Sequence, residues 1–389
     1  MKKITVLFLL FLLALCGCAS ATNHTADSTT DPQVHLPNPT QDTEPEVPPT
    51  DPVFDPYALI GQMSNEALVG QIFLARCPDV NAAEDVSSYS LGGYVLFARD
   101  FRGKTREEVL QAIDSYQQAA GIPLLIAVDE EGGIVNRVSS QPQFRDAKFP
   151  SPRIIYQDGG LPLLLETEKE KCELLASLGI NVNLAPVCDI TTNKNAFMYS
   201  RSLGQSPEIT GQYIAQTVRY YNSQQMGCVL KHFPGYGNSE DTHVGIAVDS
   251  RSLALLESND LIPFSEGIKA GASAIMISHV IIEALDPQMP ATLSQPVHNY
   301  LRTNMGFTGV IITDDLVMQA ITDLYGADEA AVLAVEAGND LLIASEYAVQ
   351  YQAVLEALRS GRISRKVLED SVARILQWKY DLGLLPIVE

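Results

Sequence analysis

The stretch Gly309-Val310-Ile311-Ile312-Thr313-Asp314-Asp315 joins a short apolar run to two acidic residues that follow it directly. An apolar run of this length, without alternating polar positions, is typical of a strand covered on both faces in a parallel sheet. We therefore predict a buried strand over Val310–Thr313 that places an acidic pair at its carboxyl end.

Seven other short runs along the chain have the same Val-, Ile-, Leu- and Phe-rich character. They are Gln71–Ala75, Tyr94–Ala98, Leu124–Val128, Asn181–Ala185, Cys228–His232, Ala274–Ser278 and Asp340–Ala344. Amphipathic segments separate them, so the body of the chain consists of eight strand–helix units. This order predicts a TIM-like (β/α)8 barrel forming a single catalytic domain over residues 57–389. A doubly wound open sheet is the competing fold, and the lack of a GxGxxG or Walker pattern after any strand weakens it.

Local signals mark the ends of several of these units. Thr105-Arg106-Glu107-Glu108 is a capping box that begins a helix. We expect Ser206 to begin the helix containing Tyr213, and Ser364 to begin the last helix. Three glycines shortly before strands are expected to adopt positive φ, namely Gly271, Gly309 and Gly338.

The composition excludes some classes of partner. The chain of 389 residues has 26 Lys and Arg against 47 Asp and Glu, a net charge of −21. Such a chain repels phosphate backbones, so we expect no nucleic-acid binding. The body contains four cysteines without zinc-type spacing, which we interpret as buried thiols: Cys77, Cys172, Cys188 and Cys228.

The N-terminus has the pattern of an export signal. Lys2 and Lys3 precede an apolar run from Ile4 to about Leu15, which is too short for a comfortable membrane span. The following Leu15-Cys16-Gly17-Cys18 resembles a bacterial lipoprotein signal, with Cys18 as the lipidated residue. Residues 1–18 are therefore predicted to be a lipoprotein signal peptide; an ordinary secretory signal is the alternative. A lipid-anchored, extracytoplasmic protein is expected.

Residues 19–56 are rich in Thr, Pro, Asp and Glu and contain no Lys or Arg. Their prolines disfavour both helix and sheet, and they include few large apolar residues to offset the entropy of ordering. We predict a disordered tether between the lipid anchor and the barrel.

Three of the predicted strands end in polar clusters. Leu124–Val128 leads into Asp129-Glu130-Glu131-Gly132-Gly133, Cys228–Leu230 into Lys231-His232-Phe233-Pro234-Gly235, and Val310–Ile312 into Thr313-Asp314-Asp315. In a barrel of parallel strands these clusters meet at one edge, where active sites form. The coincidence predicts a catalytic pocket there.

The motifs at this edge carry a family resemblance. Lys231-His232-Phe233-Pro234-Gly235, Asp241-Thr242-His243, Pro290-Ala291-Thr292-Leu293-Ser294 and Gly306-Phe307-x-Gly309-Val310-x-x-Thr313-Asp314-Asp315 resemble glycoside hydrolase family 3, in its β-N-acetylglucosaminidase branch. Asp129-x-Glu131-Gly132-Gly133 and Arg201-Ser202-Leu203-Gly204 resemble further motifs of the family. The resemblance runs from about Ala67 to Leu385.

This resemblance implies a retaining exo-β-N-acetylglucosaminidase without metal or cofactor, acting on N-acetylglucosamine ends of peptidoglycan or chitin-type glycans. The family's nucleophile falls on Asp314. Side chains of successive strand residues point to opposite faces, so the Asp315 side chain should point away from that of Asp314. We therefore expect Asp315 to cap or support a helix beginning near Leu316.

By the same resemblance, the acid/base is a dyad of Asp241 and His243. A carboxylate bound to one ring nitrogen fixes the tautomer and leaves the other nitrogen for the leaving oxygen. Glycines border the loop from Gly235 to Gly245, so it has the means to move over a substrate.

The resemblance places sugar binding on five residues, namely Asp129, Arg137, Arg201, Lys231 and His232. A regular strand would point Lys231 and His232 to opposite sides, so we predict a bulge or a cis peptide there. His279 is expected to lie behind the residues that contact the substrate and to support them. The chain departs from the family pattern at Tyr236, where histidine is common, and at Ile134, where arginine is common.

Three other functions stay open. A histidine acid/base does not repel an incoming anion, which leaves a phosphorylase as one alternative. A β-glucosidase of the same family is the second, and a lipoprotein that only binds glycans is the third. Nothing in the sequence sets the oligomeric state.

Overall fold

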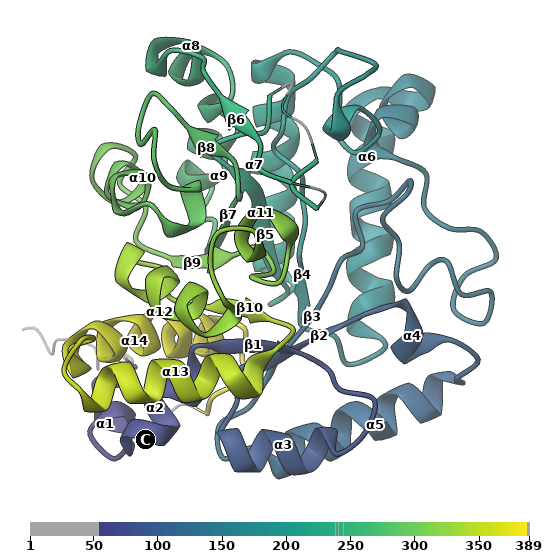
Figure 1. Cartoon of the computed structure of the whole chain (residues 1–389). Coiled ribbons are helices and arrows are strands. Elements are labelled where there is room, and N and C mark those ends of the chain that lie inside the picture. The colour runs from purple at the N-terminus through teal and green to yellow at the C-terminus, as the bar shows by residue number, and fades with distance from the viewer. Residues whose placement is uncertain (1–53, 238, 240, 244, 387–389) are drawn as a thin grey trace, which may run out of the picture. The chain divides into compact units, whose positions relative to one another are not determined.

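The computed structural model describes residues 54–386, apart from 238, 240 and 244. Its main sheet has eight strands in the order β10-β1-β2-β3-β4-β5-β7-β9, and each neighbouring pair is parallel. A parallel bridge between Ile312 and Leu341 links the two ends of this order. The sheet is therefore a nearly closed barrel with helices around it, which confirms the predicted TIM-like fold (Figure 1).

All eight predicted strands are present in the barrel, within two residues of the expected starts. They are β1 (Phe73–Arg76), β2 (Gly93–Leu96), β3 (Leu125–Val128), β4 (Val182–Asn183), β5 (Gly227–Phe233), β7 (Ala274–Ile277), β9 (Val310–Thr313) and β10 (Leu342–Ala344). Two further short strands, β6 (Val248–Asp249) and β8 (Ile281–Ile282), pair with each other outside the barrel. No sequence signal predicted them.

Helices fill the connections between strands. They are α1 (Pro56–Ile60), α2 (Asn65–Gln71), α3 (Ala82–Tyr89), α4 (Ala98–Phe101), α5 (Arg106–Ala119), α6 (Pro152–Ala176), α7 (Pro207–Ser223), α8 (Leu253–Ser258), α9 (Leu261–Lys269), α10 (Gln295–Asn299), α11 (Gln319–Thr322), α12 (Ala327–Ala337), α13 (Tyr347–Arg359) and α14 (Arg365–Asp381). Short helical turns lie at η1 (Phe197–Ser200), η2 (Ala291–Leu293) and η3 (Tyr300–Asn304). None of the helices in the described part of the chain is long and apolar enough to cross a membrane.

The predicted helix starts are confirmed. Thr105 Oγ1 accepts from Glu108 N at 3.2 Å, and Glu108 Oε2 accepts from Thr105 N at 2.7 Å, which completes the capping box of α5. Ser206 and Ser364 are the N-caps of α7 and α14. These caps satisfy or flank the free N–H groups of a helix's first turn.

Three sequence expectations were wrong in detail. Gln71 ends α2 instead of beginning a strand, because its buried side-chain amide donates to the carbonyl of Ser90. Pro56 is the first residue of α1, where a missing N–H costs nothing, so the folded body begins one residue early. Gly309 does not take positive φ: a Cβ there would lie 2.4 Å from the carbonyl oxygen of Ser273. Gly271 and Gly338 do take positive φ, at 90° and 113°.

The described cysteines lie in the barrel and its surrounding layer as free, buried thiols. Burial raises the pKa of Cys77, Cys172 and Cys228 to about 12, so these groups stay protonated. The signal peptide with Cys18 and almost all of the predicted tether lie outside the described residues.

Candidate active site

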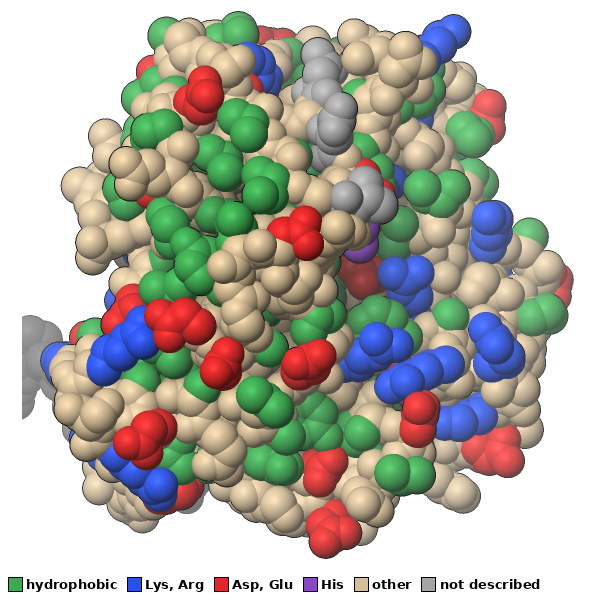
Figure 2. Space-filling view, in the orientation of Figure 1, with side chains coloured by type: hydrophobic (Ala, Val, Ile, Leu, Met, Phe, Trp, Pro, Cys, Tyr) green, Lys and Arg blue, Asp and Glu red, His purple; other side chains and the backbone are tan. Residues whose placement is uncertain are grey.

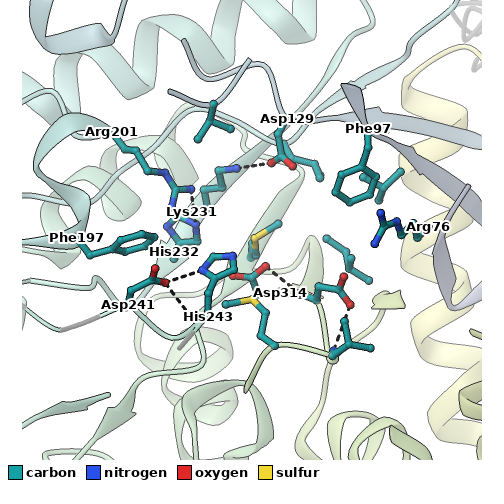
Figure 3. A pocket seen from close by; sticks show the side chains of 18 of the residues that line it. Arg76, Phe97, Asp129, Phe197, Arg201, Lys231, His232, Asp241, His243 and Asp314 are labelled. Atoms are coloured by element: carbon teal, nitrogen blue, oxygen red, sulfur yellow. Dashed lines mark hydrogen bonds and ion pairs between the residues drawn. The ribbon is translucent and has the colours of Figure 1, made fainter. Parts of the chain in front are cut away.

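The carboxyl ends of the barrel strands surround a pocket of about 810 Å³. It is lined by every residue that the sequence assigned to catalysis or sugar binding: Asp129, Arg137, Arg201, Lys231, His232, Asp241, His243 and Asp314. Figure 3 shows the side chains that it labels, among them Asp129, Lys231 and Asp314, around one space, and they come from several different strands and loops. The topology thus brings together residues up to 185 positions apart, as the edge argument predicted.

Asp314 follows β9 and projects into this pocket. Its Oδ1 accepts a hydrogen bond from the backbone N–H of Asp315 at 2.8 Å. Burial works to raise the pKa of Asp314, but the fields of His279, His232 and Lys231 together with that N–H outweigh it, so the pKa lies below its usual range. The carboxylate is therefore ionised at neutral pH, as a nucleophile must be.

Asp315 has a supporting role, although not as a helix cap. Its Oδ1 accepts from Val317 N at 3.3 Å, and its Oδ2 accepts from the Ser345 hydroxyl at 2.5 Å. The next helix begins only at Gln319, three residues later than expected, because Leu316 to Met318 form a turn. His279 is fully buried behind this turn, with Nε2 3.0 Å from the carbonyl oxygen of Asp315.

Asp241 and His243 form a hydrogen-bonded pair at the rim of the pocket. Asp241 Oδ1 lies 2.7 Å from His243 Nδ1 and also accepts from the backbone N–H of His243 at 2.9 Å. The imidazole side chain is 56% exposed, and its Nε2 has no hydrogen-bond partner among the described residues. The pair therefore presents one free ring nitrogen to a ligand, in the arrangement expected of an acid/base.

Thr242, between the two members of the pair, is fully buried and anchors their loop. Its hydroxyl forms a short hydrogen bond with Tyr236, and its carbonyl accepts from Ala320 N at 3.2 Å. The Phe197 ring packs 5.9 Å from the His243 ring and 5.7 Å from the Tyr236 ring. Tyr236, where the family often has histidine, thus holds the dyad's loop through a hydroxyl.

A buried ion network forms the floor of the pocket. Arg201 binds Glu131 through two nitrogens, at 2.7 and 2.9 Å, and Lys231 Nζ lies 2.7 Å from both Glu131 and Asp129. Burial works to raise the pKa of Glu131, but Arg201 and Lys231 outweigh it and hold the pKa far below its usual range. These ion pairs hold the charged side chains of the floor in position before a substrate binds.

His232 is held by a residue that sequence reasoning missed. Asp189 Oδ2 lies 2.8 Å from His232 Nδ1, and Asp189 Oδ1 accepts from Tyr236 N at 2.7 Å. The Lys231–His232 peptide bond is cis, and the ladder between β5 and β7 shifts register there. The predicted backbone irregularity is confirmed, and both side chains line the pocket.

The loop after β3 carries Arg137 and is shaped by Glu130. The buried Glu130 carboxylate accepts from the backbone N–H groups of Arg137, Val138 and Ser139, at 2.9, 2.8 and 3.3 Å. This loop also places Ile134, the second departure from the family pattern, on the pocket lining.

Other lining residues escaped the sequence analysis. Arg76 ends β1 and Phe97 follows β2, both at the edge where active-site residues were expected, so position alone could have indicated them. Asp189 lies four residues beyond the predicted strand Asn181–Ala185 and follows no recognisable pattern. Among the described residues, no group of three His, Cys, Asp or Glu side chains could hold a metal ion.

The family model described as glycosyl hydrolase family 3 N terminal domain matches residues 60–378. The chain belongs to glycosyl hydrolase family 3. It is therefore a glycoside hydrolase, and the resemblance seen in its motifs is confirmed.

Relatives support the same branch of the family. The chain is 32% identical over 263 residues to the β-hexosaminidase of Xylella fastidiosa strain M23, covering 65% of this chain and 76% of that one. It is 32% identical over 300 residues to the β-hexosaminidase of Stenotrophomonas maltophilia strain K279a, covering 72% and 86%.

Two solved structures have a similar fold. A glycoside hydrolase family 3 β-N-acetylglucosaminidase from Paenibacillus aligns with a TM-score of 0.77 and 32% identity, covering 83% of this chain but only 63% of that enzyme. The β-N-acetylhexosaminidase of Beutenbergia cavernae aligns with a TM-score of 0.73 and 26% identity, covering 82% and 99%. The chain thus spans less than two thirds of the first of these enzymes and nearly all of the second.

Proposed function

We propose that this family 3 enzyme is a retaining exo-β-N-acetylglucosaminidase that releases terminal N-acetylglucosamine from peptidoglycan or chitin-type glycans. One observation carries the proposal: an ionised carboxylate, Asp314, and an Asp241–His243 pair line the same pocket. The relatives named as β-hexosaminidases and β-N-acetylglucosaminidases support the choice of sugar.

In the first step, Asp314 attacks the anomeric carbon and forms a glycosyl ester while the bond to the leaving oxygen breaks. His243 Nε2 gives its proton to that oxygen, and Asp241 stabilises the imidazolium that carries it. The ring hydroxyls of the sugar meet the floor network, where Asp129 supplies acceptors and Lys231 and Arg201 supply charged donors.

In the second step, His243 Nε2 takes a proton from water, and the oxygen attacks the anomeric carbon. The ester breaks and Asp314 returns as a carboxylate, so the product keeps the β configuration. Two displacements on one carbon restore the starting stereochemistry.

Hydrolysis of 4-nitrophenyl β-N-acetylglucosaminide tests the mechanism. Asp314→Ala is expected to lower kcat by at least about 10⁴-fold, and sodium azide should then yield the α-glycosyl azide. His243→Ala is expected to lower kcat by about 10²–10⁴-fold, with azide yielding the β-azide, because azide then opens the ester. Asp315→Asn is the matched carboxylate control and should lose far less. Unchanged hydrolysis in both Asp314→Ala and His243→Ala would remove this mechanism.

The same assay separates the rival activities. Faster turnover of 4-nitrophenyl β-glucoside than of the N-acetylglucosaminide would make the enzyme a glucosidase. Formation of N-acetylglucosamine 1-phosphate on adding inorganic phosphate would make it a phosphorylase. Glycan binding without turnover of either substrate would leave only the lipoprotein that binds glycans.

We also propose that residues 1–18 are a lipoprotein signal, that Cys18 is lipidated, and that residues 19–56 tether the barrel outside the cytoplasmic membrane. The motif Leu15-Cys16-Gly17-Cys18 supports this arrangement. In the full chain, Cys18→Ala should abolish incorporation of a labelled fatty acid and release the protein from the membrane fraction. Cys16→Ala is the control and should change neither; loss of labelling in Cys16→Ala alone would refute the assignment.

A further inference from the structure

Two arginines share one aromatic ring on a single wall of the pocket. Arg76 lies with its guanidinium carbon 4.6 Å from the centre of the Phe97 ring, and Arg137 lies 5.8 Å from the same centre. Neighbouring strands supply the three residues, since Arg76 ends β1, Phe97 follows β2 and Arg137 is carried by the loop after β3. In Figure 3 Arg76 and Phe97 lie on the opposite side of the pocket from Phe197 and Asp241.

Both guanidinium groups have unused hydrogen-bond donors. The Arg76 side chain has no hydrogen bond or ion pair with any described residue, and its Nε is buried without a partner. Arg137 Nε is buried without a partner as well. The nearest carboxylate to Arg137 is Asp129 at 3.7 Å, and that carboxylate already binds Lys231 at 2.7 Å.

This arrangement contrasts with the other arginine of the pocket. Two nitrogens of Arg201 donate to the Glu131 carboxylate, so the charge of Arg201 is neutralised within the protein. Buried donors normally have partners, and exceptions gather at functional sites. Arg76, by contrast, has no carboxylate partner among the described residues, in a chain whose net charge is −21.

The chemistry of these side chains selects an anion. A guanidinium stacked on a ring is held in plane while its edge stays free, and that edge matches the paired oxygens of a carboxylate or phosphate. Arg102, in the segment after Phe97, is exposed. Figure 2 shows Lys and Arg side chains gathered beside the hollow of this face. Such a field raises the local concentration of anionic ligands.

We propose that Arg76, which lies over the Phe97 ring, binds an anionic oxygen group of the ligand, while Arg137 beside it keeps its assignment to the sugar. No family motif indicated Arg76. The inference rests on the proposed function, because it takes the pocket to hold a glycan. The anion is either a carboxylate on the leaving part of the glycan or free phosphate next to the sugar.

A comparison of two leaving groups tests the carboxylate. Rates are measured with 4-nitrophenyl β-N-acetylglucosaminide and with its 3-carboxy-4-nitrophenyl analogue, which differs by one carboxylate. Arg76→Gln should lower kcat/KM for the carboxylate substrate by about 10- to 100-fold, and for the neutral substrate by no more than about threefold. Arg76→Lys should recover part of the loss, since it keeps the charge but not the fork. Arg102→Gln, the exposed control, should affect both substrates equally.

A second arm tests phosphate with the neutral substrate. If phosphate is the anion, the wild-type enzyme forms N-acetylglucosamine 1-phosphate, Arg76→Gln loses this product by about tenfold or more, and neither enzyme prefers the carboxylate substrate. If Arg76→Gln alters both aryl substrates equally and phosphate has no effect, the anion site is refuted.

Binding separates this proposal from the proposed function. Calorimetry with the uncleavable thioglycosides of the same two aglycones measures affinity without turnover. If the wild-type enzyme hydrolyses neither substrate but binds the carboxylate thioglycoside more tightly, and Arg76→Gln removes that preference, the anion site stands and the proposed hydrolysis fails. Equal affinity of the two thioglycosides for the wild-type enzyme, without a phosphate effect, refutes the anion site alone.

Discussion

Lys379 on α14 offers a quantitative test of how burial acts in this barrel. Its side chain is fully buried, and Nζ donates to Gln71 Oε1 at 2.9 Å. No carboxylate lies within ion-pair distance among the described residues, and burial lowers the pKa of Lys379 from 10.5 to about 7. We expect Lys379→Met to stabilise the protein, and to do so most strongly at low pH.

The sign follows from proton binding. Below pH 7 both the folded and the unfolded chain hold the Lys379 proton, and the folded state bears the full cost of a buried charge. Between pH 7 and 10.5 the unfolded chain binds a proton that the folded one does not, so stability rises with pH across this window. Because a tenfold change in proton affinity is worth about 1.4 kcal/mol, the cost is about 5 kcal/mol at pH 6 and about 2 kcal/mol at pH 9.

The substitution also leaves Gln71 Oε1 without its donor, which costs about 1–3 kcal/mol at every pH. The stabilisation by Lys379→Met should therefore be about 3 kcal/mol larger at pH 6 than at pH 9. Urea unfolding at both pH values measures it, with the wild-type protein as reference so that other titrating groups cancel. Lys269→Met, at a side chain 67% exposed, is the control and should show no such difference. A stability change for Lys379→Met that is equal at both pH values would refute the reasoning.

Three other substitutions probe the site and its supports. Glu131→Gln leaves the Arg201 charge buried and unmatched, so chemical denaturation should show a loss of about 3–5 kcal/mol; a loss below 1 kcal/mol would contradict the ion network. Tyr236→Phe leaves the Thr242 hydroxyl unpaired and loosens the dyad's loop, so kcat should fall by up to about tenfold with KM little changed; an unaltered kcat would mean that this hydroxyl pair does not position His243. Gly235→Ala would bring a Cβ to 2.8 Å from Asp260 at a φ of 117°, and thermal unfolding should show a loss of at least about 1–3 kcal/mol; unchanged stability would show that the turn relaxes.

The barrel could be predicted because its strands are short apolar runs, and such runs are visible in the local sequence without any knowledge of tertiary contacts. Val310–Thr313 is identical in the prediction and the structure. Errors arose where tertiary contacts decide the outcome. The amide of Gln71 finds the Ser90 carbonyl, and Gly309 meets the Ser273 carbonyl; neither contact leaves a local signal. The pair β6 and β8 is too short to show any period.

The sequence predicted the position of the site and the residues assigned to catalysis and sugar binding, but not the contacts between them or every residue of the lining. The strand-edge rule and the motifs led to Asp314, Asp241 and His243. The bidentate pairing of Arg201 with Glu131 joins residues 70 positions apart, and no spacing in the sequence encodes it. Arg76 was missed because a single cation after a strand has no pattern until the neighbouring strands bring an aromatic ring beside it.

The proposed acid/base pair and the proposed nucleophile lie on different parts of the fold. Asp314 extends from the barrel wall, whereas His243 lies on an exposed rim segment anchored mainly through Thr242. In the proposed mechanism, changes in that segment alter proton delivery, and with it the tolerated leaving group, while the sugar-binding residues of the floor stay the same. Selection can therefore act on the two halves of the reaction one at a time, which makes the rim the natural place for related enzymes to diverge.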